Sequence, residues 1–157
     1  MQFPLGQYID AIHAVAVHDW IIDNTGGLAG IKDLGQLESV LQHIQNDDYY
    51  PTFDAKLMHL IFGINKFHAF NDGNKRSSLT LGAYFLTLNG YDYCVPQFML
   101  QMENIVVALA EGTISKDLLH RVTISLIQED DFSDELKLEL ANAMGHGIFL
   151  DDGNDEL

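Results

Sequence analysis

The stretch HAFNDGNKR, residues 68–76, joins two apolar segments and contains most of the chemically useful groups of this 157-residue chain. His68 supplies an imidazole that titrates near neutral pH, and Asp72 supplies a hard oxygen ligand for a divalent cation. The adjacent Lys75 and Arg76 add two positive charges that suit a phosphate group. Together these residue types predict a phosphate-handling site, and we expect the active site here.

The residues that follow predict that a helix N-terminus completes this site. Gly73-Asn74 is a turn signal, and Ser77-Ser78 leads into apolar residues at helical spacing as far as Leu88. The first N–H groups of a helix have no partner within the helix and carry the positive end of its dipole. A bound phosphate would therefore lie against the backbone of Gly73, Asn74 and the helix start, with Ser77 nearby.

The segment before the loop, from Asp54 to Phe67, is apolar on nearly every side and predicts a helix buried at the centre of the domain. Its apolar residues are Leu57, Met58, Leu60, Ile61, Phe62, Ile64 and Phe67. A loop held between two buried helices has the rigid support that a preorganised site needs. Within the loop, Phe70 is interpreted as the structural anchor that fixes it to the core.

A plain polar turn is the simpler interpretation of residues 68–76. Turn geometry accounts for Gly73 and Asn74, and His68 would then act only as a cap. Turn geometry does not, however, require histidine at position 68, phenylalanine at 70 and arginine at 76.

Other motifs are absent, including the P-loop, the Gly-x-Ser-x-Gly elbow and the His-Glu-x-x-His zinc helix. His13 and His18 are interpreted as packed or surface residues because no further ligand stands at metal spacing.

The loop resembles the signature of the Fic/Doc (death-on-curing) family, His-x-Phe-x-Asp/Glu-Gly/Ala-Asn-x-Arg. All six defined residues agree, namely His68, Phe70, Asp72, Gly73, Asn74 and Arg76. Residues 26–39, 88–91 and 110–112 are also similar to segments of the Doc branch. The resemblance covers roughly residues 5–127 and leaves out the last thirty.

The resemblance implies an enzyme that transfers a phosphoryl or nucleotidyl group from ATP to a hydroxyl group of a target protein. It implies that His68 is the general base, that Asp72 holds Mg²⁺ and that Arg76 pairs with a phosphate. The backbone of Gly73 and Asn74 and the helix start would form the anion cradle.

Two departures from the family pattern favour one of its chemistries. Many adenylylating relatives have Gly where this chain has Lys75, and a second Arg where this chain has Leu79. Both differences are similar to the Doc branch, in which the nucleotide is thought to bind reversed so that its terminal phosphate is transferred. We therefore expect protein phosphorylation, with AMP transfer (AMPylation) as the alternative. An inactive binding module with the same fold is a second alternative.

The resemblance also raises the question of how activity is restrained. Some relatives carry an inhibitory helix with the pattern Ser/Thr-x-x-x-Glu-Gly/Asn. Residues 125–129 match its first part but continue with Asp130, and residues 107–112 contain Glu-Gly but begin with Val. Neither match is complete, so we expect the chain to be the toxin of a toxin–antitoxin pair, inhibited by a small separate antitoxin.

Composition limits the class of partner. The net charge is −15, with eight Lys and Arg residues against 23 acids, which argues against a nucleic-acid partner. No apolar run is long enough to span a membrane, and the N-terminus lacks a signal-peptide pattern. The single cysteine, Cys94, cannot form an internal disulfide, so a cytoplasmic location is expected.

The whole pattern predicts an all-α, compact single-domain helical bundle of the Fic/Doc type. Residues 1–128 would form the helical domain and residues 129–157 an acidic C-terminal helix and tail, the last residues frayed. Beside the helix at 54–67 and the one that ends near Asn89, helices are expected at about 4–23, 33–44, 97–110, 115–127 and 133–144. Residues 45–51 are a possible short hairpin or flap that, in relatives, aligns the target segment. Residues 91–96 should be extended because Pro96 disfavours a helical Val95.

Overall fold

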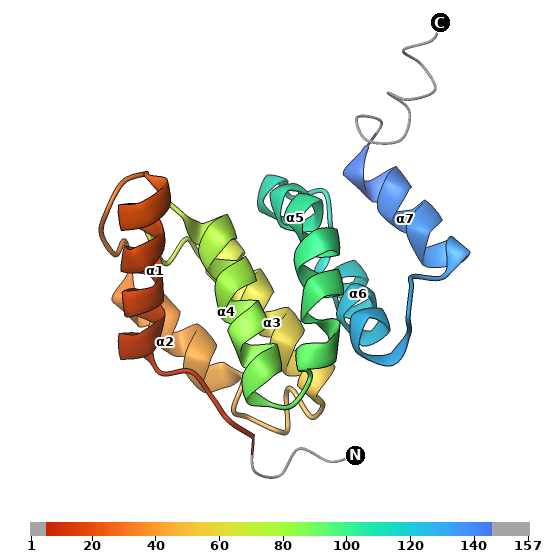
Figure 1. The fold of residues 1–157 in the computed structure, drawn as a ribbon, viewed down its shortest axis with the longest axis horizontal. Coiled ribbons are helices and arrows are strands. Elements are labelled where there is room, and N and C mark those ends of the chain that lie inside the picture. Colours follow the sequence, from red (N-terminus) through yellow and green to blue (C-terminus); the bar gives the residue numbers. More distant parts are fainter. Residues whose placement is uncertain (1–5, 146–157) are drawn as a thin grey trace, which may run out of the picture.

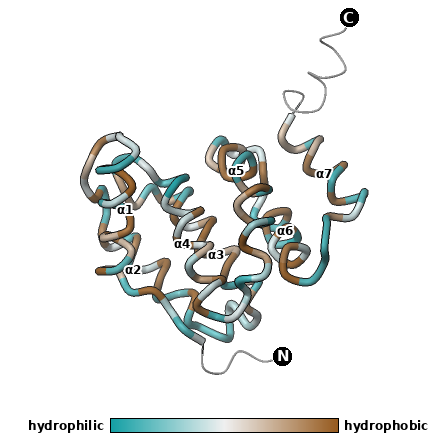
Figure 2. The backbone as a smooth tube through the Cα atoms, in the orientation of Figure 1, coloured by the Kyte–Doolittle hydropathy of each residue, from teal (hydrophilic) through white to brown (hydrophobic). Residues whose placement is uncertain are grey.

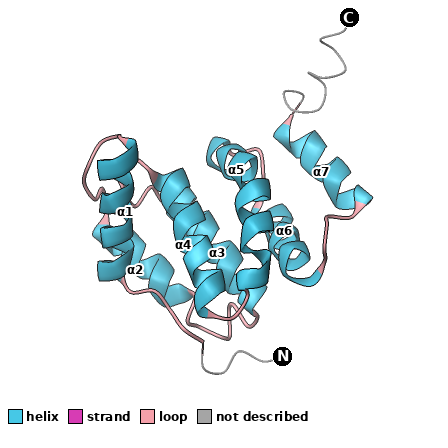
Figure 3. Cartoon of the chain, viewed as in Figure 1, coloured by secondary structure: helices cyan, strands magenta, loops and turns pink. Residues whose placement is uncertain are grey.

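The computed structural model describes residues 6–145, which form a bundle of α-helices (Figures 1 and 3). The elements are α1 (Ala11–Thr25), α2 (Leu34–His43), α3 (Phe53–Lys66), α4 (Asn74–Leu88), the short 3₁₀ helix η1 (Asp92–Cys94), α5 (Val95–Glu111), α6 (Lys116–Gln128) and α7 (Asp134–Met144). Within these residues there is no strand, and the single β-bridge joins Ile31 to Phe70. The all-α prediction is confirmed.

Helix α3 is the centre of the bundle, as its all-round apolar sequence predicts. It packs against α2, α4, α5 and α6, and apolar stretches run along α3 and α5 in Figure 2. Leu57, Leu60, Ile61 and Ile64 are all completely buried. Because the loop at 68–73 connects α3 to α4, this buried helix fixes one end of the candidate site.

Side-chain caps set the start of several helices. Asp33 accepts a hydrogen bond from the backbone N–H of Gln36 at 3.1 Å, and Ser133 accepts one from Leu136 at 3.1 Å, as predicted. Asp10 accepts from His13 at 2.7 Å, so α1 begins only at Ala11. The predicted start near Pro4 falls outside the described residues, but Gly6 to Asp10 are not helical.

Helix α1 buries a different face from the one that its apolar spacing suggests. Ile9, Ile12, Ala16 and Trp20 predicted the helix, yet Ile12 is 84% and Trp20 63% exposed. The buried residues of α1 are Ala14, His18, Ile21 and Ile22. They recur at helical spacing, but a histidine among them hides the stripe from a simple count of apolar residues.

The possible flap at residues 45–51 is not a hairpin, and that prediction is wrong in this structure. The segment forms turns at the N-terminal end of α3. Lys56 holds it there by donating to the carbonyl oxygen of Ile44 at 2.8 Å and to Asp47 at 2.7 Å. The loop at 68–73 lies at the other end of α3, about 20 Å away for a 14-residue helix. Residues 45–51 therefore do not border the candidate site.

The expected extended segment at 91–96 is also replaced by helix. η1 covers Asp92–Cys94, and Val95 has helical dihedral angles, φ −60° and ψ −44°. Pro96 stands in the first turn of α5, where its missing N–H costs no hydrogen bond. Pro96 therefore marks the beginning of a helix and does not exclude one.

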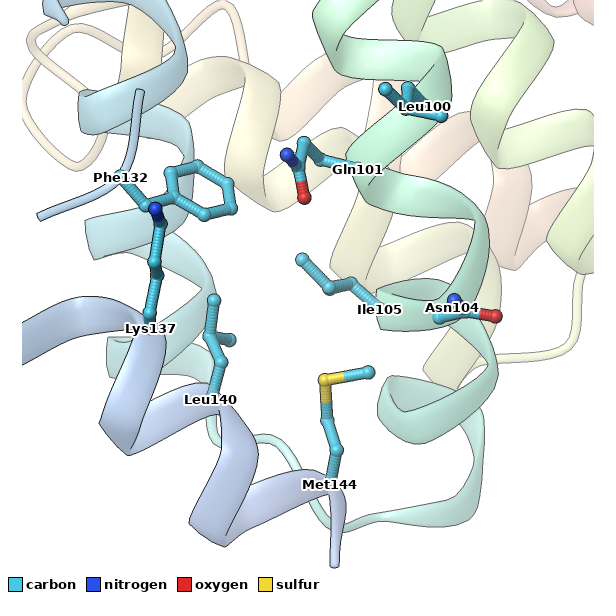
Figure 4. Close-up of a pocket in the computed structure, with 8 residues that line it drawn as sticks. All are labelled: Leu100, Gln101, Asn104, Ile105, Phe132, Lys137, Leu140 and Met144. Carbon is cyan, nitrogen blue, oxygen red and sulfur yellow. The ribbon is translucent and has the colours of Figure 1, made fainter. Parts of the chain in front are cut away.

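Helix α7 packs at the side of the bundle away from α1 (Figure 1) through its buried residues Leu136 and Leu140, and Phe132 in the preceding connection is buried as well. A hollow of about 320 Å³ remains between α5 and α7, lined by apolar residues and by Gln101, Asn104 and Lys137 (Figure 4).

The predicted domain boundary after residue 128 coincides with the end of α6 and stays a prediction. The predicted frayed tail, residues 146–157, lies outside the described residues. Among those described, no helix is long and apolar enough to cross a membrane.

Candidate functional site

The loop between α3 and α4 presents His68 to solvent while its next two residues are buried. His68 is exposed and has a left-handed backbone, φ +50°, and Ala69 and Phe70 lie in the core. Histidine is among the residues that adopt this conformation more readily than most, although it is less favourable than a right-handed one. The left-handed turn lets one residue point outward immediately before an anchored pair.

Phe70 is completely buried and packs against α1. Its ring stacks on the imidazole of His18, with the ring centroids 3.8 Å apart and an angle of 5° between the planes. This burial is the placement that an anchor of the loop requires.

The segment from Gly26 to Asp33 is bonded to the loop through its backbone. Lys32 and Asp33 donate from their N–H groups to the carbonyl oxygen of Ala69 at 2.9 and 3.1 Å, and Asn71 donates to Gly30 at 3.1 Å. The sequence of this segment is similar to the Doc branch, but it did not indicate the pairing with the loop. Backbone pairing between distant segments leaves no periodic signal in a sequence.

Glycines make this close approach possible. A Cβ atom on Gly27 would lie 2.7 Å from Oδ2 of Asp72, and one on Gly30 would lie 2.7 Å from Nδ2 of Asn71. Both glycines also have positive φ angles, +120° and +109°, which L-residues rarely adopt. The Gly-Gly and Ala-Gly pairs at 26–30 were the available signal for this contact.

Asp72 is held as an ionised carboxylate at the edge of the loop. Its Oδ2 accepts from the N–H of Leu28 at 3.0 Å and its Oδ1 from the N–H of Gly73 at 2.8 Å. These two hydrogen bonds, Leu28 first, lower the pKa of Asp72, and the nearby Arg76 adds to the effect. The side chain is 44% exposed, so the oxygens retain open lone-pair positions.

Asp72 fits a magnesium ion better than a metal that needs several protein ligands. No group of three or more His, Cys, Asp or Glu side chains in residues 6–145 is arranged to hold a metal. Mg²⁺ commonly takes one or two carboxylates and fills its other positions with water and substrate phosphates. Asp72, a single exposed and ionised carboxylate at the proposed phosphate site, could supply such a ligand to Mg²⁺.

Arg76 lies beside Asp72 on the first turn of α4. Its guanidinium donates to the carbonyl oxygen of Gly26 at 2.8 Å and to the hydroxyl of Thr25, and it stands 3.9 Å from Oδ1 of Asp72. The side chain is 38% exposed. The C-terminal end of α1 thereby sets the position of a cation next to the candidate metal ligand.

Asn74 and Gly73 shape the N-terminus of α4. The Asn74 side chain accepts from the N–H of Phe70 at 3.0 Å and donates to its carbonyl oxygen at 2.9 Å, so it closes the loop. Gly73 has φ +81° and caps α4 with no side-chain hydrogen bond. Its own N–H is engaged by Asp72, so a bound phosphate would rely on the N–H groups at the start of α4.

Lys75 and Ser77 lie on opposite sides of this turn. Lys75 is exposed, as a residue that meets a nucleotide must be. Ser77 is completely buried, its N–H donates to Gly73 at 2.9 Å, and its hydroxyl has no hydrogen-bond partner among the described residues. The predicted contact of Ser77 with a phosphate stays a prediction, and its hydroxyl faces the core here.

The comparisons with known proteins place the chain in a family. Residues 8–86, which include α1 to α3, the whole loop and all but the last two residues of α4, match the model of the Fic/DOC family over just more than half of the chain. The chain belongs to the Fic/DOC family. It is also similar to "Protein kinase doc" of Escherichia phage P1, with 29% identity over 114 residues that cover 69% of this chain and 86% of the relative. The Doc-like assignment made from the loop is thus confirmed.

Proposed function

We propose that this Fic/DOC protein is a phosphotransferase that moves the terminal phosphate of ATP to a hydroxyl side chain of a target protein. The observation that carries the proposal is an exposed His68 in the loop that leads into α4, with an ionised Asp72 beside Arg76 at the N-terminus of that helix, which no side chain caps. The similarity to the phage relative, which is named a protein kinase, supports the same reaction.

His68 would act as the general base. It accepts the proton of the target hydroxyl as that oxygen forms a bond to the terminal phosphorus and the bond from this phosphorus to the ADP oxygen breaks. The exposed position of His68 gives a protein substrate access to the imidazole. Phe70, buried two residues further along, would anchor the loop that carries this base.

Asp72, Arg76 and the start of α4 would hold the phosphates. Asp72 would bind Mg²⁺, which neutralises phosphate charge when present. Arg76 would turn part of its guanidinium toward a phosphate while it remains bonded to Gly26. The first N–H groups of α4 would receive the remaining phosphate oxygens.

Lys75 supports transfer of the terminal phosphate over transfer of AMP. A glycine here would let the distal phosphates approach the backbone, whereas an exposed lysine side chain occupies that space and adds a charge. The nucleotide would then bind with its terminal phosphate beside His68.

We also propose that a separate antitoxin protein restrains this activity. The incomplete match to an inhibitory helix at residues 125–129, at the end of α6, supports this, and Glu129 accepts a hydrogen bond there from the Ser125 hydroxyl at 2.6 Å. That end of α6 lies away from the loop at 68–76 (Figure 1). Glu129 is therefore badly placed to block the site from within the same chain.

The test is incubation of the chain with candidate target proteins and Mg²⁺ with either [γ-³²P]ATP or [α-³²P]ATP, followed by intact-mass measurement of the targets. The proposal expects γ-label and a mass increase of one phosphate. Label from the α-position would make AMP transfer the reaction. No label from either nucleotide with any target would leave a binding module with the family fold.

A further inference from the structure

His18 makes two contacts with the loop from the buried face of α1. Its ring lies parallel to that of Phe70, and its Nε2 is 2.6 Å from the carbonyl oxygen of Asp72. The side chain is completely buried, although α1 as a whole is a peripheral helix (Figure 1). The His18 side chain thus contacts both Phe70 and Asp72, the candidate metal ligand.

The chemistry of the second contact fixes where the ring hydrogen lies. A carbonyl oxygen only accepts, so Nε2 must carry the hydrogen and donate it to Asp72. Nδ1 is buried without a hydrogen-bond partner, and Oδ1 of Asp19 lies 3.5 Å from it. A buried polar atom without a partner is unfavourable, so the ring is a poor choice for packing alone.

An apolar residue would fill this position without that cost. Phe or Leu on the buried face of α1 could pack against Phe70 but could not reach the carbonyl group of Asp72 with a hydrogen. Gly73 also lies close to the ring, because a Cβ atom built on it would be 3.4 Å from Nε2 of His18. The donor is the property that His18 adds.

We propose that His18 is a positioning residue that fixes the direction of the Asp72 carboxylate from outside the loop. By holding the carbonyl group of Asp72, it sets the backbone on which the bonds from Leu28 and Gly73 to the carboxylate depend. Its value for catalysis rests on the proposed role of Asp72 as the metal ligand. The hydrogen bond itself is independent of that role.

The first measurement uses the unmodified protein without nucleotide. Long-range ¹H–¹⁵N spectra of the histidine rings report which nitrogen carries the hydrogen. His18 should appear with its hydrogen on Nε2 and exchange slowly with solvent, because the atom is buried. A ring with hydrogen on Nδ1 alone would overturn the proposal.

The second measurement distinguishes the effect of the hydrogen-bond donor of His18 from the effect of its aromatic ring. His18→Phe keeps an aromatic ring against Phe70 and removes the donor, whereas His18→Gln keeps an amide donor of similar reach and removes the ring. Amide hydrogen exchange at Leu28 and Gly73, whose N–H groups bond to Asp72, should become about five- to tenfold faster in His18→Phe. In His18→Gln it should change by less than about twofold.

His13→Phe is the matched control, because His13 is an exposed histidine of the same helix whose ring stacks on Tyr84. It should leave exchange at Leu28 and Gly73 unchanged. The proposal is overturned if His18→Phe behaves as the unmodified protein does, or if both His18 variants are affected equally.

Phosphate transfer by the same variants then tests the catalytic consequence. His18→Phe should need about tenfold more Mg²⁺ for half-maximal transfer than His18→Gln does. If the unmodified chain transfers no phosphate, the proposed function fails, but the ring spectra and the exchange rates still decide the role of His18.

Discussion

Asn74 pairs with both backbone groups of Phe70, accepting from its N–H at 3.0 Å and donating to its carbonyl oxygen at 2.9 Å. Asn74→Ala should therefore lower the free energy of unfolding by about 1–3 kcal/mol, because two backbone groups lose their partner. Asn74→Asp keeps the acceptor, loses the donor and should also be destabilised. Urea denaturation measures both, and unchanged midpoints would contradict this account of the loop.

His68→Ala should abolish most of the transfer, since loss of a general base costs ~10²–10⁴-fold in rate. His68 has a left-handed backbone that alanine tolerates less well than asparagine does. His68→Asn is the matched variant, equally inactive but closer to the unmodified protein in stability. Label transfer from [γ-³²P]ATP at the wild-type rate by either variant would show that His68 is not the base.

Asp72→Asn keeps the shape of the side chain and removes the charge that a magnesium ion needs. Nucleotide binding should then lose most of its dependence on Mg²⁺ in calorimetry. Asp23→Asn, which changes an exposed carboxylate on α1, makes the same change in net charge and should have no such effect. Equal Mg²⁺ dependence in both variants would place the metal elsewhere.

Lys75→Gly should weaken transfer of the γ-label and can admit some transfer of the α-label, because the space and charge of the lysine side chain are removed. Leu79 stands where adenylylating relatives carry a second Arg, so full conversion is not expected. Because Lys75 is exposed but lies in the first turn of α4, the glycine should cost about 1 kcal/mol or less in stability. α-label on the target from the unmodified protein would contradict the assignment of Lys75.

His59 should make the protein less stable in mild acid. Burial, and then the charge of Lys116, lower its pKa from 6.5 to about 4, and Tyr50 lies 3.0 Å from its Nδ1. Between these pH values the unfolded chain binds the proton and the native protein does not. The stabilisation is complete above pH 6.5 and is lost as the pH falls toward 4, by at most about 3 kcal/mol.

His59→Gln removes the titrating group, so its urea midpoint should vary less between pH 7 and pH 4.5 than that of the unmodified protein. His13→Gln, at an exposed position, is the control and should retain the full variation. An identical pH dependence in all three proteins would show that His59 does not carry the effect.

The sequence predicted those parts of the fold that depend on local pattern. α3 was found from apolar residues on every side, and the starts of α2 and α7 from the caps Asp33 and Ser133. The buried face of α1 was missed because Trp20 and Ile12 are exposed while His18 is buried. An apolar pattern does not count a histidine toward the buried stripe, so the interpretation of His18 as packed or surface did not reveal this face.

The candidate site was located from sequence, but its support was not. His68, Asp72 and Arg76 stand in one stretch, so their proximity needed no structure. The bond from Leu28 to Asp72 and the pairing of Lys32 with Ala69 join residues about 40 positions apart. The flap was misplaced for another reason: it was carried over from relatives, although residues 45–51 precede α3 and the loop at 68–73 follows it, so the two lie at opposite ends of that helix.

The exposed turn between α6 and α7 has a practical consequence for protein engineering. The loop at 68–76 is bonded to α1 and to residues 26–33, whereas Glu129, Asp130 and Asp131 are exposed. A fluorescent domain inserted between Asp130 and Asp131 should fold beside the bundle and leave the Asp72 carboxylate undisturbed. The same insertion between Gly27 and Gly30 would separate the backbone groups that hold that carboxylate. Only the fusion at Asp130 and Asp131 would therefore give a fluorescent protein with an intact candidate site.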